Sequence, residues 1–188
     1  MERDVEKNMG AEPGITSQPD VANGSDTALE EGVVKLLADR NLAITCAESC
    51  TGGLLSGRII NVPGVSDVYK AGFVTYSNKA KRKLLGVKKS TLKKFGAVSS
   101  QTAREMAAGA ARAAKADVAV AVTGIAGPDG GTPEKPVGLV YIGCSVKGKV
   151  TVKKCQFSGS RGQIRESAVV AALKLVRKCV EKRDGSPC

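Results

Sequence analysis

Histidine is absent from this chain of 188 residues, and aromatic residues make up only 3% of it. Without an imidazole, a Ser-His-Asp triad, a Cys-His pair and a His-ligated zinc site are all excluded. A serine or cysteine nucleophile must therefore be activated by a lysine, a tyrosine or a carboxylate. Because aromatic rings are scarce, the core must be built from Val, Ala, Ile and Leu. The chain also has few aromatic side chains on which nucleic-acid bases could stack.

Signatures of membrane insertion and of disulfide bonding are missing as well. No apolar run reaches the ~18 residues that a membrane-spanning helix needs. No C-x-x-C pair occurs, and cysteines spaced irregularly in a chain with an ample core argue against a disulfide framework. The six cysteines are Cys46, Cys50, Cys144, Cys155, Cys179 and Cys188. The acidic N-terminus resembles neither a secretory signal nor an Arg-rich transit peptide, so we expect reduced thiols and a cytoplasmic location.

The net charge of +11 is distributed unevenly along the chain. Residues 1–31 hold two basic and eight acidic residues, a balance of −6, and the rest holds 27 basic and 10 acidic residues, a balance of +17. A strongly basic domain favours anionic partners such as phosphorylated small molecules, nucleic acid or acidic surfaces. Charge alone does not choose among them.

A single domain is expected, because 188 residues with 42% hydrophobic content suit one core. We interpret residues 1–24 as a disordered tail, residues 25–183 as the domain and residues 184–188 as a flexible end. Strand-like runs cover residues 42–47, 69–77, 117–123, 137–146 and 149–157, with a hairpin between the last two. Helical patterns cover residues 27–37, 54–59, 78–85, 101–115 and 162–181. This order predicts an α/β fold whose mixed sheet is covered on both faces by helices.

The turn at residues 47–53 joins a predicted strand to a predicted helix. Such a turn opens into the crevice at the carboxyl edge of a sheet, where helix amides favour anions or an oxyanion. Ser49 is placed there as a nucleophile or an oxyanion-binding hydroxyl, and Cys50 is the rival nucleophile. Alternatively, Ser49 and Thr51 only cap the helix, and the two glycines only form the turn.

A second loop, residues 124–131, leaves the clearest buried strand and contains four glycines in eight residues. So many glycines indicate special backbone dihedrals and close approach to a ligand. The loop matches neither a P-loop nor a Rossmann fingerprint. The alternative is a mobile connection without a chemical role.

Two further segments supply charged candidates. Tyr76 lies at a predicted strand end and Lys81 about one helical turn beyond it, where a desolvated lysine can become a base and a phenol can relay a proton. A solvated cationic helix face is the alternative, and we prefer it for the neighbouring Lys79, Arg82 and Lys83. Arg161 at a helix start opposes the helix dipole, which indicates either a phosphate clamp or a simple surface arginine.

The segments occur together in one known family. They read A-E-S-C-T-G-G (47–53), G-F-V-T-Y-S-N-x-A-K (72–81), G-A-V-S (96–99), G-I-A-G-P-D-G-G (124–131), E-K-P-V-G (134–138) and F-S-G-x-R (157–161). In this order, over about residues 27–182, the chain resembles the CinA C-terminal domain family, which includes a free-standing nicotinamide-nucleotide amidase. Longer members carry an additional N-terminal molybdopterin-binding-like domain, for which this chain has no room, so it resembles the free-standing form.

The resemblance implies a three-layer α/β/α sandwich with a mixed, mainly parallel sheet of about five strands. It implies hydrolysis of nicotinamide mononucleotide to nicotinate mononucleotide and ammonia, a step of pyridine-nucleotide salvage, by a homo-oligomer with no metal and no cofactor. Carried over by motif, Ser49 is the nucleophile, Tyr76 and Lys81 are catalytic, and Arg161 contacts phosphate or the transition state. Candidate substrate-binding residues are Thr51, Gly52, Gly53, Asn78, Gly124, Ala126, Gly127 and Arg161.

Two other functions remain open at this point. The basic domain suits a nucleic-acid-binding accessory protein, although its few aromatics and lack of a known motif mean that we do not expect nucleic acid as the partner. A non-catalytic nucleotide-binding domain is the other alternative. Ammonia release from a pyridine mononucleotide separates the amidase from both.

Overall fold

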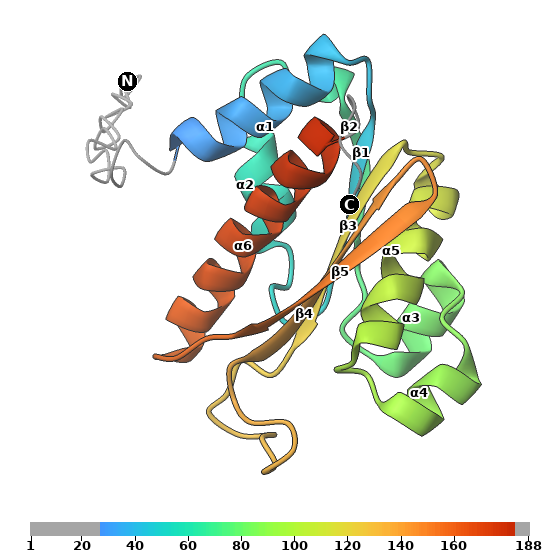
Figure 1. The fold of residues 1–188 in the computed structure, drawn as a ribbon, viewed down its shortest axis with the longest axis vertical. Helices are drawn as coiled ribbons and strands as arrows, with labels where there is room; N and C mark the ends of the chain where they lie inside the picture. Colours follow the sequence, from blue (N-terminus) through green and yellow to red (C-terminus); the bar gives the residue numbers. More distant parts are fainter. Residues whose placement is uncertain (1–26, 183–188) are drawn as a thin grey trace, which may run out of the picture.

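Helices and strands alternate along residues 27–182, the part of the chain that the computed structural model describes (Figure 1). The strands are β1 (Ile44–Glu48), β2 (Tyr69–Val74), β3 (Val118–Gly124), β4 (Leu139–Val146) and β5 (Lys149–Gln156). The helices are α1 (Thr27–Asp39), α2 (Leu54–Ile60), the 3-10 turn η1 (Val65–Asp67), α3 (Asn78–Leu85), α4 (Lys89–Phe95), α5 (Ser100–Ala114) and α6 (Arg161–Glu181). The predicted tail, residues 1–24, and the predicted flexible end, residues 184–188, lie outside the described residues.

The five strands form one sheet in the order β2-β1-β3-β4-β5. Strand β1 pairs in parallel with β2 and β3, whereas β4 is antiparallel to both β3 and β5. Four strands therefore run in one direction and β4 runs against them, which confirms the mixed, mainly parallel sheet. All five residues of β1 are buried, as expected for a strand covered on both faces.

Helices cover both faces of this sheet and make a three-layer α/β/α sandwich, as predicted. Figure 1 shows α1, α2 and α6 against one face and α3, α4 and α5 against the other. Helix α5 packs very close to the sheet, because a Cβ added to Gly143 of β4 would lie 2.5 Å from the carbonyl oxygen of Ala103. Its alanines make that approach feasible, and several of them are fully buried.

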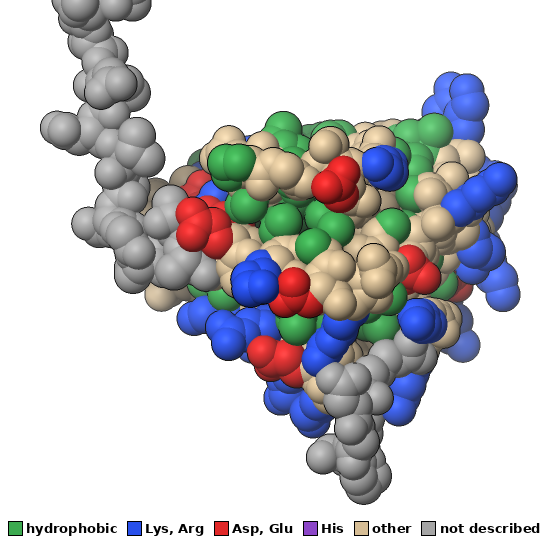
Figure 2. Space-filling view, turned by 90° about the horizontal axis from the view of Figure 1, so that it is seen from above, with side chains coloured by type: hydrophobic (Ala, Val, Ile, Leu, Met, Phe, Trp, Pro, Cys, Tyr) green, Lys and Arg blue, Asp and Glu red, His purple; other side chains and the backbone are tan. Residues whose placement is uncertain are grey.

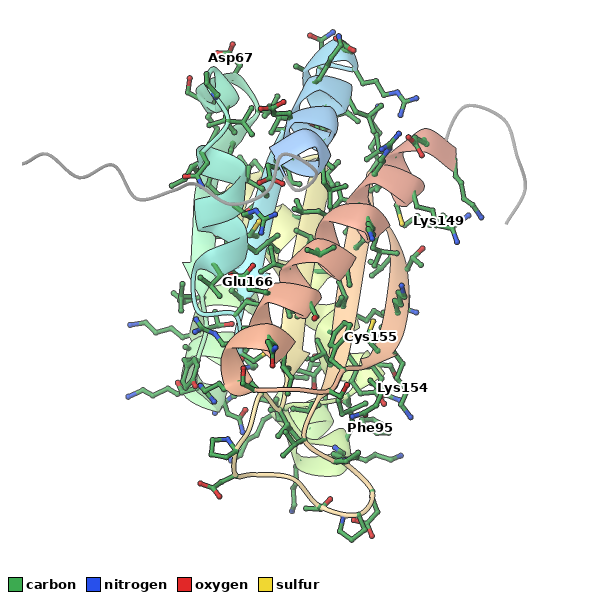
Figure 3. All side chains as sticks on the ribbon, turned by 90° about the vertical axis from the view of Figure 1, so that its left-hand side faces the viewer. Asp67, Phe95, Lys149, Lys154, Cys155 and Glu166 are labelled. Atoms are coloured by element: carbon green, nitrogen blue, oxygen red, sulfur yellow. The ribbon has the colours of Figure 1, made fainter. Side chains whose placement is uncertain are left out.

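An ion-pair network ties the helices of the first layer together. The Arg58 guanidinium on α2 contacts Glu30 of α1 at 2.6 Å and Glu166 of α6 at 3.2 Å. In Figure 3, Glu166 lies on the side of α6 that faces α2. The Glu30 carboxylate is buried, so this pair fixes the packing of α1 on α2.

The surface is strongly basic. Seen from the end opposite the 125–138 loop, Lys and Arg side chains spread along the margins, with only scattered Asp and Glu (Figure 2). Among residues 27–182, no helix is both long enough and apolar enough to cross a membrane.

The shared direction of four strands decides where the site lies. The segments that follow β1, β2, β3 and β5 all leave the sheet at the same end, so residues 49–53, 75–77, 125–138 and 157–160 lie there together. Crevices of this kind, at the carboxyl ends of parallel strands, are where α/β proteins bind their ligands. Each of the four segments carries or adjoins a candidate site residue.

Candidate active site

The turn after β1 is shaped by the buried side chain of Glu48. Its two carboxylate oxygens accept hydrogen bonds from the amides of Gly53, Leu55 and Ser56, at 2.9–3.1 Å, and from the Ser56 hydroxyl at 2.6 Å. A carboxylate thus satisfies the first amides of α2, which would otherwise lack partners. Thr51, which we predicted as a cap, has a buried hydroxyl with no hydrogen-bond partner among the described residues.

Arg165 of α6 holds the same turn from the other side. Its Nε donates to the carbonyl of Cys50 at 3.0 Å and its Nη2 donates to the carbonyl of Thr51 at 2.8 Å. The amide of Ser49 donates to Val122 of β3 at 3.0 Å. Together with Glu48, these contacts fix the backbone on both sides of the Ser49 hydroxyl.

The Ser49 hydroxyl meets the amine of Lys81. The Lys81 Nζ donates to Ser49 Oγ at 2.8 Å and to the carbonyl oxygen of Thr75 at 2.7 Å. Helix α3 delivers the lysine from its first turn, since Ser77 caps this helix by accepting a hydrogen bond from the Ala80 amide. The Lys81 side chain is only 1% exposed, although its neighbours on α3 face solvent.

Burial shifts the pKa values of two groups near the Ser49 hydroxyl, the amine of Lys81 and the thiol of Cys50. Desolvation lowers the pKa of Lys81 from 10.5 to about 8, so near physiological pH a far larger share of its amine is neutral than in an ordinary lysine, although most of it remains protonated. Desolvation raises the pKa of the Cys50 thiol to about 11, which leaves little thiolate. The structure therefore places the Ser49 hydroxyl beside an amine that loses its proton more readily than an ordinary lysine, and beside a thiol that is seldom ionised.

Tyr76 and Arg161 form the open side of the site. The Tyr76 side chain is 63% exposed, and its hydroxyl accepts a hydrogen bond from Arg161 Nη2 at 2.9 Å. The Nη1 of Arg161 donates to the carbonyl oxygen of Gly127 at 2.6 Å. Arg161 thus links the segments after β2, β3 and β5. No hydrogen bond joins Tyr76 to Ser49 within residues 27–182.

A pocket of about 280 Å³ lies between these two sides. Eight of the predicted site residues line it, namely Ser49, Tyr76, Asn78, Lys81, Gly124, Ala126, Gly127 and Arg161. Three do not line it, namely Thr51, Gly52 and Gly53. Gly53 instead uses its amide for Glu48. The pocket brings together residues from five separate segments of the chain.

The lining of the pocket also includes residues whose backbone amides have no hydrogen-bond partner among residues 27–182. Residues 125–127 follow β3, and the Ile125 amide donates to Leu139. The amides of Ala126 and Gly127 make no hydrogen bond in the part of the chain that the structure describes, and both residues line the pocket. Unpaired amides at a pocket wall are the groups that stabilise an oxyanion.

Sequence reasoning missed several residues that support the site. Glu48 and Thr75 lie within the motifs given above, but the sequence does not predict their roles. Glu48 caps α2, and the carbonyl of Thr75 positions the Lys81 amine. Arg165 lies one helical turn after Arg161, and that spacing is the only signal that could have identified it. Ala97 and Val98 of the pocket wall carry no chemical signal.

The fold and the site define an α/β sandwich protein with a Ser-Lys pair at the carboxyl edge of its sheet. The chain belongs to the family described as the CinA C-terminal domain, whose model matches residues 26–180. It is 57% identical over 155 residues to a CinA-like protein of Kosmotoga olearia, and 54% identical over 153 residues to a Clostridium novyi protein named as competence-damage inducible. These alignments cover 82% and 81% of this chain but only 38% and 37% of the two relatives.

Solved structures match over almost their whole length. A competence/damage inducible protein from Agrobacterium tumefaciens has a TM-score of 0.82 at 42% identity, with 87% of this chain and 99% of that chain covered. A CinA superfamily protein from Escherichia coli has a TM-score of 0.80 at 34% identity, with 88% and 95% covered. The names of these relatives and structures refer to CinA or to competence and damage, and none states a reaction.

Proposed function

We propose that the protein is an amidohydrolase that converts nicotinamide mononucleotide to nicotinate mononucleotide and ammonia. The observation that carries this proposal is the 2.8 Å contact between the buried Lys81 amine and the Ser49 hydroxyl at the wall of a pocket. A serine with an adjacent lysine base is a known solution to acyl transfer without imidazole. The basic surroundings suit a substrate that carries a phosphate.

The first chemical step is acylation of Ser49. The neutral Lys81 amine takes the proton of the Ser49 hydroxyl while Oγ bonds to the carboxamide carbon, which gives a tetrahedral intermediate. The Thr75 carbonyl accepts one N–H of the amine at 2.7 Å, which orients its lone pair towards Ser49. When the C–N bond breaks, Lys81 returns the proton to the leaving nitrogen, and ammonia departs.

The oxyanion of this intermediate needs hydrogen-bond donors at the pocket wall. We assign that role to the unpaired amides of Ala126 and Gly127. The amides of residues 51–53, which the sequence suggested, are less suitable because these residues lie outside the pocket and the Gly53 amide already binds Glu48.

Deacylation reuses the same lysine. Water adds to the ester carbon while Lys81 accepts one of its protons, and the proton passes to Ser49 Oγ as the C–O bond breaks. The products are the free serine and a carboxylate on the pyridine ring. Arg161 keeps its charge on the open side, where it can pair with an anionic group of the substrate or product.

An ammonia assay with the purified chain and nicotinamide mononucleotide tests the proposal. We expect turnover by the wild type, complete loss in Ser49→Ala and near-wild-type turnover in Cys50→Ala. Mass spectrometry of a rapidly quenched reaction should show a transient acyl adduct on the peptide that contains Ser49. Turnover retained by Ser49→Ala, or an adduct on Cys50, would remove Ser49 as the nucleophile, and no ammonia from wild type would refute the activity.

A further inference from the structure

A second hollow lies beside the catalytic pocket, between α3 and α4. It has a volume of about 510 Å³ and is lined by Asn78, Lys79, Arg82, Lys89, Leu92 and Lys93. Two of the four cations come from each helix, so they face one another across the hollow. No acidic residue lines it. We call this feature the α3–α4 groove.

The four cations of the groove are unpaired in the part of the chain that the structure describes. Among residues 27–182, none of them forms an ion pair or donates a side-chain hydrogen bond. The carboxylate of Glu105 on α5 accepts hydrogen bonds from the Lys88 amide at 2.8 Å and from the Thr91 hydroxyl at 2.6 Å, and it forms no ion pair with any of the four cations. Single unpaired lysines are common on helix surfaces, but four cations converging on one hollow repel one another, and a bound anion would relieve that repulsion.

The groove adjoins the catalytic pocket. Asn78 lines both of them, and it follows Tyr76 and Ser77 at the start of α3. A ligand in the groove can therefore extend into the pocket past the Asn78 amide. The proposed reaction uses none of the groove cations, so their convergence needs an explanation of its own.

The residues that line the α3–α4 groove indicate which class of anion it binds. No aromatic side chain lines the groove, so it offers no stacking surface for nucleic-acid bases. Its volume suits a small molecule and not a polymer track. Four cations match the several negative charges of linked phosphates better than the single charge of a carboxylate.

We propose that the α3–α4 groove is a binding site for a phosphate chain, that is, a di- or triphosphate group. The chain lies between Lys79 and Arg82 on one wall and Lys89 and Lys93 on the other, with Asn78 at the end nearest the catalytic pocket. The site does not depend on the amidase reaction, so its test uses binding alone.

Calorimetric titration with inorganic tripolyphosphate at fixed ionic strength measures the binding. We expect one saturable site per chain in the wild type and an affinity about tenfold weaker in Lys89→Gln/Lys93→Gln, because two of the four groove cations are removed. Glutamine is a good helix former, so α4 is retained. The matched control is Lys174→Gln/Lys178→Gln, which removes two exposed lysines with the same spacing from α6 on the other face, and it should bind like the wild type.

Thermal unfolding gives a second readout. Tripolyphosphate should raise the melting temperature of the wild type and of the α6 control, and should raise that of the α4 variant much less, since only binding to the folded state stabilises it. This measurement also shows that each variant is folded.

Two sources of a phosphate chain can be distinguished by adding adenosine diphosphate and pyrophosphate as separate ligands. Tighter binding of the nucleotide points to a ligand that spans groove and pocket, and equal binding points to a free phosphate chain; both support the site. The proposed site would be overturned if the α4 and α6 variants lost tripolyphosphate affinity equally, or if the wild type showed no saturable binding. A single-stranded oligonucleotide that binds more tightly than tripolyphosphate and depends on Lys89 and Lys93 would overturn the ligand class.

Discussion

The two sides of the catalytic pocket each present a cation, and the two cations differ in their access to water. On the closed side, Lys81 is 1% exposed and its amine donates hydrogen bonds to Ser49 and Thr75. On the open side, Arg161 is exposed and holds Tyr76, which is itself 63% exposed. The same sign of charge therefore serves two purposes within one pocket.

Solvent access explains the division. A buried ammonium loses hydration, and its neutral form becomes accessible near neutral pH, which makes a base. A guanidinium in water stays charged and offers a rigid fork of donors, which suits recognition and not proton transfer. In the proposed reaction, burial and residue type together assign the base: only an amine can lose its proton here, and only a buried one does so near neutral pH.

Removing the buried amine should have the largest effect. In Lys81→Met we expect kcat to fall by about 10³-fold, because general-base assistance is lost. Lys81→Arg should fail similarly, since a guanidinium does not accept the proton. The ammonia assay measures both variants, and circular dichroism confirms that they fold. Activity above one tenth of the wild type in Lys81→Met would assign the base to another residue.

The pH dependence should report the same amine. Because burial lowers the pKa of Lys81 to about 8, kcat/KM should rise roughly tenfold per pH unit below this value and level off above it. The folded-state pKa lies below the ordinary 10.5, so the unfolded chain binds more protons between these values. The free energy of unfolding, relative to Lys81→Met, should therefore rise with pH from about 8 to 10.5. A flat rate profile would contradict the role of Lys81.

The sequence predicted candidate residues on both sides of the pocket. With histidine absent, Lys81 and Tyr76 were the available activators near Ser49, and family motifs pointed to both. The buried strands β1 and β3 were recognisable because their apolar runs are unbroken. Whether Lys81 turns inwards could not be predicted, because it lies on a helix whose other basic residues all face water.

Long-range packing explains the remaining differences. The cap on α2 comes from Glu48, a residue of the preceding strand, whereas local rules place a cap immediately before the helix. Tyr76 pairs with Arg161, 85 residues later, and no local pattern predicts that contact. Helix α4 was missed because its seven residues include only Leu92 and Phe95 as large apolar side chains, too few to show a helical period.

The buried Glu48 carboxylate, which caps α2 next to the Ser49 turn, should contribute to the stability of the fold. Glu48→Gln replaces an acceptor of four hydrogen bonds with a group that also carries N–H donors, so buried amides of α2 lose partners. We expect the free energy of unfolding to fall by about 2 kcal/mol. The control is Glu166→Gln. The Glu166 carboxylate, which pairs with Arg58, is 54% exposed, so this substitution should change the free energy of unfolding by less than about 0.5 kcal/mol. Urea unfolding of both variants makes the comparison, and equal losses would contradict it.

The smallest effect is expected on the open side. Tyr76→Phe removes the hydroxyl that Arg161 contacts at 2.9 Å but keeps the ring, so we expect KM to rise about three- to fivefold with kcat nearly unchanged. Tyr141→Phe on β4 is the matched control and should leave both constants as they are, since its hydroxyl has no hydrogen bond to any described residue. Steady-state kinetics separates the two constants. If kcat instead fell as far as in Lys81→Met, the phenol would share the activation of Ser49, and the contrast between a closed basic side and an open binding side would fail.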